Sequence, residues 1–115
     1  MRRLLLATAV TCLPTATFAA DWWVVIGYFD HPPMEWDDGV LTQGNDLEAA
    51  LQDCGLSAYW DFTAKFDGFD TDGRGSVFVV YTPELLEESA AESLLEAALP
   101  CVPDAYIKEA TYFGE

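Results

Sequence analysis

Two cysteines open the same short motif in this chain. Cys54 begins the sequence Cys-Gly-Leu-Ser-Ala-Tyr and Cys101 begins Cys-Val-Pro-Asp-Ala-Tyr, so the pattern C-x-x-x-A-Y occurs twice, 47 positions apart. An apolar segment with helical spacing precedes each copy, and a β-rich run, at residues 23–26 or 77–80, precedes each helix. A strand-helix-strand pattern that occurs twice predicts a two-layer α+β domain with the element order βαββαβ.

Apolar spacing and turn residues give the boundaries of these elements. We predict a strand at 22–29, a loop at 30–44, and a helix that is capped by Asn45 and closed by Gly55. A strand at 56–63, a turn at 67–75 and a strand at 76–81 follow. The second helix is expected to open at Thr82-Pro83-Glu84 and to stop at Pro100, before a last strand at 105–109. The natural packing is a ferredoxin-like, four-stranded antiparallel sheet with both helices on one face.

The other face of such a sheet has to meet solvent, a partner or a ligand. The chain holds sixteen Phe, Tyr and Trp residues, more than one interface between a sheet and two helices of this size needs. We therefore expect some of them on the open face or its rim. The candidate ligand-binding residues are Trp22, Trp23, Tyr28, Trp60 and Tyr81.

The first nineteen residues have the pattern of a signal peptide. Arg2-Arg3 form a charged start, residues 4–10 an apolar run, and Ala19 and Ala20 a small-residue cleavage site. A lipoprotein cut before Cys12 is a weaker alternative, because the apolar run ahead of it is very short. Residues 20–115 then form a single domain of an exported protein, periplasmic or secreted.

The charge of the chain limits its partners. The formal net charge is −15, and all twenty acidic residues follow residue 20, against three basic residues there, Lys65, Arg74 and Lys108. Nucleic acids and anionic membranes select basic surfaces, so we expect no nucleic-acid partner and, once the signal peptide is removed, no membrane. A basic protein is a compatible partner, but a charge that only keeps the domain soluble is the simpler explanation of the composition.

The opening strand resembles that of the SPOR domain, the sporulation-related repeat of exported bacterial proteins. The family often begins with aromatic-x-V-x-x-G-x-F, and residues 22–29, Trp-Trp-Val-Val-Ile-Gly-Tyr-Phe, fit this pattern. The helix with spaced Ala and Leu, the closing Gly55 and the Ala58-Tyr59 pair are also similar. Of the G-P-F that the family usually repeats in its second half, this chain keeps only Pro83. The resemblance implies the βαββαβ fold and binding of peptidoglycan glycan strands.

Metal and catalytic motifs are weak. The segment from Asp70 to Gly75 looks like a fragment of a calcium loop, but Gly68 and Val79 stand where its first and last ligands would be, which favours a hairpin turn. His31 is the single histidine and lies among carboxylates in a proline-rich loop. No serine stands in a nucleophile motif. We therefore expect no metal site, no cofactor and no enzymatic activity.

The pair Cys54 and Cys101 gives two opposing arguments. An oxidising compartment favours a disulfide between them. In an idealised ferredoxin-like domain, however, the helices run antiparallel, so the positions after each helix lie at opposite ends of the sheet, farther apart than the roughly 7 Å that a disulfide allows. We predict that the bond forms, which requires a departure from the ideal arrangement.

Three functional interpretations follow. The first is a non-enzymatic, exported binding module that holds peptidoglycan glycan on an aromatic sheet face. The alternative is an acidic, periplasmic protein-binding module that inhibits or chaperones a basic partner. The third is a stable exported domain whose ligand no motif reveals. Salt separates the first two, because binding to a basic protein weakens as salt rises whereas stacking on a glycan changes little.

Overall fold

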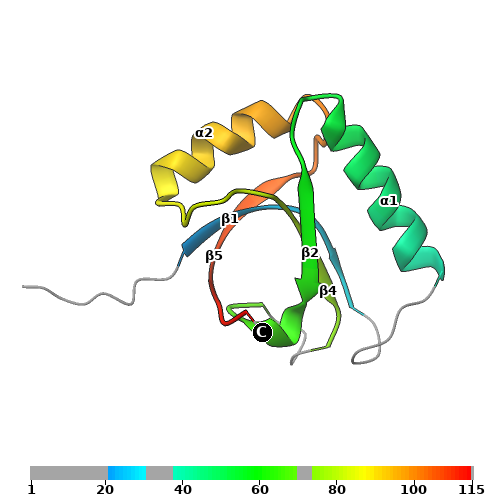
Figure 1. Ribbon diagram of the computed structural model, residues 1–115, viewed down its shortest axis with the longest axis horizontal. Helices are drawn as coiled ribbons and strands as arrows, with labels where there is room; N and C mark the ends of the chain where they lie inside the picture. The colour runs from blue at the N-terminus through cyan, green and yellow to red at the C-terminus, as the bar shows by residue number, and fades with distance from the viewer. Residues whose placement is uncertain (1–20, 31–37, 70–73, 115) are drawn as a thin grey trace, which may run out of the picture.

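The computed structural model describes residues 21–30, 38–69 and 74–114, and within them the chain is an α+β fold. The two predicted helices are present, and they lie on one side of an antiparallel sheet (Figure 1). The predicted count of four strands is wrong, because a fifth strand of two residues, β3, joins the sheet. The elements are β1 (Asp21–Phe29), α1 (Asp38–Gln52), β2 (Ala58–Phe62), the 3-10 helix η2 (Thr63–Lys65), β3 (Phe66–Asp67), β4 (Ser76–Val80), α2 (Glu88–Ala98) and β5 (Tyr106–Tyr112).

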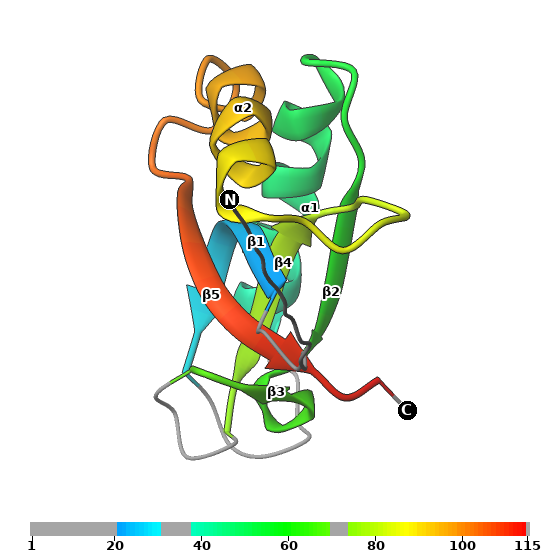
Figure 2. The ribbon, with the colours of Figure 1, turned by 90° about the vertical axis from the view of Figure 1, so that its left-hand side faces the viewer.

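The sheet is strongly curled. Its strand order is β2-β4-β1-β5-β3, so β2 and β3 are the two outermost strands, yet only the three residues of η2 separate them in the sequence. In a flat five-stranded sheet the outermost strands lie about 19 Å apart. The four residue steps from Phe62 to Phe66 reach at most about 14 Å. The sheet therefore has to curl until its two edges approach one another, as both ribbon views show (Figures 1 and 2).

The helices cover the outer face of this curl and form the first core. Val24 and Ile26 of β1 and Phe78 of β4 contribute from the sheet, and Leu51 of α1 and Ala91 of α2 contribute from the helices. All five side chains are buried, and partly buried Leu, Ala and Trp side chains pack around them. This is the helix-sheet core that the apolar spacing predicts.

A bulge in β1 changes which side chains point into the curl. The pairing register between β1 and β4 shifts between Val25 and Gly27. Before the shift, Val25 faces the inside of the curl and Ile26 faces the helices; after it, Gly27 also faces the helices and Tyr28 turns inward. A Cβ atom on Gly27 would come within 2.6 Å of the Leu47 side chain of α1. Glycine at this position thus lets the bulge and the helix approach each other closely.

Both helices begin elsewhere than predicted. α1 starts at Asp38, so residues 38–44 of the predicted loop are helical, and residues 31–37 lie outside the described residues. Gly44 suggested a loop, but it lies inside α1, where a Cβ atom would come within 2.3 Å of the Phe78 ring. α2 starts at Glu88 instead of Thr82. The Thr82 hydroxyl accepts a hydrogen bond from the backbone N–H of Glu84, at 3.3 Å, and so closes a local turn before the helix.

The predicted disulfide is present. Cys54 and Cys101 are bonded, with their Cα atoms 6.1 Å apart. The argument against the bond assumed that the two helices run side by side and antiparallel. Figure 1 shows instead that the C-terminal ends of α1 and α2 lie close together, where the two cysteines follow them. The helices diverge toward their N-terminal ends. The repeated motif therefore marks two helix ends that are tied together.

Loss of this disulfide is expected to destabilise the fold. The bond closes a loop between residues separated by 47 positions, for which the chain-entropy model gives about 4 kcal/mol. We expect the double variant Cys54→Ser/Cys101→Ser to lose about 2–4 kcal/mol of unfolding free energy in urea denaturation. Reductant should lower the unfolding free energy of the native chain by a similar amount and leave that of the variant unchanged. Equal midpoints for both proteins without reductant would contradict this account.

Candidate functional site

A second core of mainly aromatic side chains fills the inside of the curl. Trp23 of β1 packs edge-on against Phe66 of β3, with ring centroids 5.4 Å apart, and Phe66 lies 4.8 Å from the ring of Tyr112 of β5. Beneath these rings lie Val25, Val77, Val79 and Ala110, all of them buried. The sheet face that we expected to be open is thus covered by the protein's own side chains. A hollow at one end of the curl gives a ligand access to this face.

The five candidate residues do not share one face. Trp23 and Tyr28 point into the curl, where Tyr28 packs against Phe69 with centroids 5.2 Å apart. Trp22 packs on the helix-facing core, and Trp60 of β2 packs near Phe78 on that same side, with centroids 6.3 Å apart. Tyr81 follows β4 and is 54% exposed. The structure brings together two of the five, Trp23 and Tyr81, which line the same hollow.

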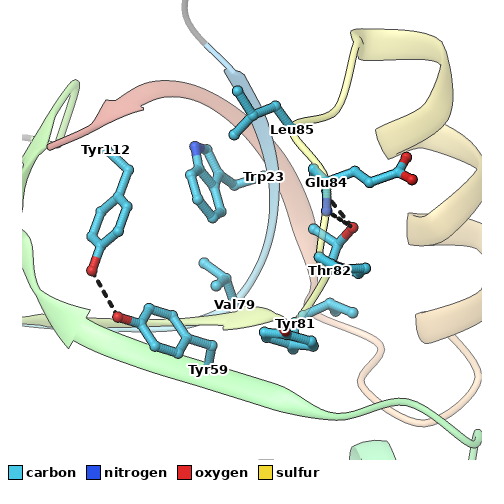
Figure 3. A pocket seen from close by; sticks show the side chains of 10 residues that line it. Trp23, Tyr59, Val79, Tyr81, Thr82, Glu84, Leu85 and Tyr112 are labelled. Atoms are coloured by element: carbon cyan, nitrogen blue, oxygen red, sulfur yellow. Dashed lines mark hydrogen bonds between the residues drawn. The ribbon is translucent and has the colours of Figure 1, made fainter. Parts of the chain in front are cut away.

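This hollow, here called the mouth pocket, lies at one end of the curl. It has a volume of about 220 Å³. Rings of the second core form its inner wall, and the turn between β4 and α2 forms its outer wall (Figure 3). Leu85, which is 74% exposed, stands at its edge beside Trp23. Its lining residues are Trp23, Tyr59, Val79, Val80, Tyr81, Thr82, Pro83, Glu84, Leu85 and Tyr112.

A hydrogen-bond network at the inner wall joins strands that are not neighbours in the sheet. The hydroxyl of Tyr112 donates to Oδ2 of Asp61 at 2.6 Å, and the hydroxyls of Tyr59 and Tyr112 are 2.7 Å apart. The hydroxyl of Tyr59 also donates to Oδ2 of Asp61, at 3.2 Å, so the two phenols and the carboxylate form one cluster. The cluster of Tyr59, Tyr112 and Asp61 links β2 to β5 across the curl (Figure 3 shows the two tyrosines).

The Asp61 carboxylate is held from several sides. Asp61 is 7% exposed, and its Oδ1 accepts the backbone N–H of Phe62 at 2.8 Å. The ammonium of Lys65, on the turn that follows β2, lies 3.8 Å from the same oxygen. A buried carboxylate is costly unless it is paired and hydrogen-bonded, and here both conditions are met. Asp61 therefore anchors the network and acts as a structural acceptor.

The network also shifts a pKa. Burial raises the pKa of Tyr112 well above its ordinary value of 10.0, and the hydrogen bond that Tyr112 donates to the Asp61 carboxylate raises it further, because that bond favours the protonated phenol. The Tyr112 hydroxyl accordingly stays a donor over the physiological range. Tyr59, which lines the mouth pocket as well, brings its hydroxyl to the same cluster.

Three residues of this site were missed by the sequence analysis, each for an identifiable reason. Tyr112 lies beyond the predicted end of the last strand at residue 109, whereas β5 continues to Tyr112. Leu85 was assigned to a helix that begins only at Glu88. Tyr59 was used only as part of a repeated motif. The alternation of β2, with Ala58 and Trp60 facing the helices, does place Tyr59 and Asp61 together on the other face.

No metal-binding group is found in the part of the chain that the structure describes, where no three His, Cys, Asp or Glu side chains gather as ligands would. His31 and the acidic loop around it lie outside the described residues, as do residues 70–73 of the calcium-loop fragment. Arg74, at the end of that fragment, forms an ion pair with Asp30 at 3.0 Å. This pair holds the end of the turn against β1.

Comparisons with known proteins gave no match: no family model, no curated protein and no solved structure matches this chain. Among the described helices, none is long and apolar enough to cross a membrane. The predicted signal peptide lies in residues 1–20, outside the described residues.

Removing the Tyr112 hydroxyl is expected to weaken the closure of the curl. Tyr112→Phe takes a hydrogen-bond donor from a buried carboxylate, which costs about 1–3 kcal/mol at neutral pH. The native protein should also lose stability as the pH rises above 10, because unfolded Tyr112 ionises there while the folded residue stays protonated.

Urea denaturation from pH 7 to pH 11.5 checks both effects. Above pH 10, Tyr112→Phe should lose less unfolding free energy than the native chain does. Tyr81→Phe, which changes an exposed tyrosine, serves as the control and should behave like the native chain. Identical pH profiles for native chain and Tyr112→Phe would rule out the network as the cause.

Proposed function

We propose that this chain is a non-enzymatic, exported binding module that holds peptidoglycan glycan at the mouth pocket. The observation that supports this best is the pocket itself, where the rings of Trp23 and Tyr81 border a solvent-accessible hollow at the end of the curl. Aromatic side chains offer apolar faces together with polar tips, which suits the mixed surface of a sugar. The pocket is small, so it takes one ring of a longer strand.

Hydrogen bonding adds selectivity to this proposal. The Tyr59 hydroxyl accepts a hydrogen bond from a sugar hydroxyl, while its contacts with Asp61 and Tyr112 fix its orientation from behind. A site built to pair with a ligand hydroxyl rejects analogues that lack it. Glycan strands without stem peptides are the ligand that the SPOR resemblance implies, and their hydroxyls supply the donors.

The finer fold assignment belongs to the same proposal. The four longer strands have the order β2-β4-β1-β5, all neighbours being antiparallel, with a helix in each of the two crossovers. This order supports a ferredoxin-like, SPOR-like origin of the fold, to which β3 and the curl are additions. The disulfide supports export to an oxidising compartment such as the periplasm.

The curl changes where a glycan can bind. In an open sheet, Trp23 and Tyr28 would both be available, and replacing either would remove binding without harm to the fold. Here Trp23 donates from its indole Nε1 to the carbonyl of Ala110 at 2.9 Å, and Tyr28 packs inside the curl, so both substitutions would damage the core. Tyr81 is the informative position, because it lines the pocket and is exposed.

Tyr81→Ala is expected to reduce glycan binding at least about fivefold while leaving the unfolding free energy within about 0.5 kcal/mol of the native value. Co-sedimentation with peptidoglycan sacculi, intact and stripped of stem peptides, measures the binding at low and high salt. Tyr106→Ala is the matched control, because Tyr106 is a tyrosine of similar exposure, 41%, outside the pocket. No pelleting of the native chain with stripped sacculi, or equal loss in both variants, would refute the proposal.

A second function is favoured by the charge around α2. Residues 81–99 contain five glutamates and no Lys or Arg. We therefore keep, as the alternative, an acidic module that binds a basic partner protein, as its inhibitor or chaperone. Its binding would fall steeply with salt, unlike that of a glycan held by stacking.

A further inference from the structure

A shallow apolar groove runs beside α2, separate from the interior of the curl. Its volume is about 490 Å³, and the turn between β4 and α2 forms one side of it. This turn loops out from the body next to α2 (Figure 2). Small and apolar side chains of α2 form the other side. The lining residues are Tyr81, Thr82, Pro83, Leu86, Ala90, Ser93, Leu94 and Ala97.

The residues that line the groove are those of a helix-binding surface. Ala90, Leu94 and Ala97 recur at the spacing of one helix face, and the two alanines are exposed. Small side chains along a helix let a second helix approach closely. Beside them, Tyr81 and Leu85 present large exposed apolar areas, which mark interaction surfaces on soluble proteins.

Carboxylates lie beyond one end of this groove, around a second hollow that shares Leu86 with it. Glu87 and Glu88 lie with Leu85 and Leu86 around a hollow that Asp21 and Glu109 also line. An apolar strip with an acidic border fits a segment that has apolar residues on one face and Lys or Arg residues on the other.

The cations that the structure describes do not neutralise this border. Lys65 pairs with Asp61, and Arg74 pairs with Asp30. The remaining cation, Lys108, lies on β5 opposite Trp23 of β1. A net charge of −15 therefore acts on any approaching molecule. It disfavours a second copy of the chain and an anionic lipid surface, and it attracts a basic protein.

We propose that the α2 groove binds a basic amphipathic helix of a partner protein. The proposal gives the protein-binding alternative a defined surface, and it goes beyond glycan binding at the mouth pocket. The apolar face of the partner helix lies along Ala90, Leu94 and Ala97, and its Lys or Arg residues meet Glu87 and Glu88. The two sites share only residues 81–83, so Ala90 reports on the groove alone, whereas Tyr81 lines both sites.

The first test fills the groove. The probe is a synthetic 18-residue helix with Leu on one face and Lys on the other, and its binding is measured by isothermal titration calorimetry. Ala90→Trp should weaken binding about tenfold, because the indole occupies the groove. Ser89→Trp is the matched control, since Ser89 is an exposed, neutral neighbour on α2 that does not line the groove. A scrambled peptide of equal charge should bind the native chain more weakly.

The second test removes charge. Glu87→Gln/Glu88→Gln should weaken binding of the probe about threefold at low salt and should make its affinity less dependent on salt. Asp46→Asn/Glu48→Gln removes the same charge from exposed positions of α1 and should have a smaller effect. Equal losses from the two pairs, or equal affinities for Ala90→Trp and Ser89→Trp, would overturn the proposal. Sedimentation equilibrium that shows a dimer broken by Ala90→Trp would assign the groove to a second copy instead.

The same variants keep the two proposals distinguishable. Ala90→Trp leaves the mouth pocket unchanged, so its pelleting with stripped sacculi should equal that of the native chain. Loss of sacculus binding together with probe binding would show that Ala90→Trp acts through the fold, and would overturn the assignment to the groove. Probe binding with no sacculus binding would support the groove and refute the glycan proposal.

Discussion

The short link between β2 and β3 is the constraint on which the rest of this structure depends. Three residues of η2 connect the two outermost strands of the sheet, so the sheet cannot lie flat. Once it curls, the face turned away from the helices encloses a volume that has to be filled. Trp23, Phe66 and Tyr112 fill it with ring contacts, and the hydrogen-bonded cluster of Tyr59, Tyr112 and Asp61 joins β2 and β5. The high aromatic content of the chain is explained by this second core.

The sequence allowed the class of fold, both helices and four of the five strands to be predicted, because those features depend on local periodicity and turn chemistry. It did not allow the curl to be predicted. β3 consists of only two residues, Phe66 and Asp67, and its pairing with β5 is a long-range event with no local signal. The prediction for Gly44 was wrong for a related reason. Glycine suggested a loop, but Gly44 lies in α1, where a side chain would collide with the Phe78 ring. Likewise, Thr82 and Pro83 have the chemistry of a helix start but close a turn.

The candidate site could be predicted only in part, for the same physical reason. Aromatic composition indicated a ligand-binding face, and Trp23 and Tyr81 do meet at one hollow. Side chains alternate between the two faces along a strand, however, and the bulge after Val25 interrupts that alternation within β1. Trp22 and Tyr28, six positions apart and so expected on one face, therefore point to opposite faces. The amino-acid types of the five residues do not indicate which of the two cores each residue joins.

The position of α2 connects the architecture to both proposed sites. At its C-terminal end the disulfide ties Cys101 to Cys54 after α1. Before its N-terminal end, the carbonyl of Leu86 accepts a hydrogen bond from the backbone N–H of Trp22 at 3.0 Å, which fixes the turn to β1. The turn that forms the outer wall of the mouth pocket and one side of the α2 groove is therefore held at the sheet, and α2 is held at the far end. A surface that is already ordered loses less conformational entropy when a ligand binds, and this favours a preformed binding module over a site that assembles around its ligand.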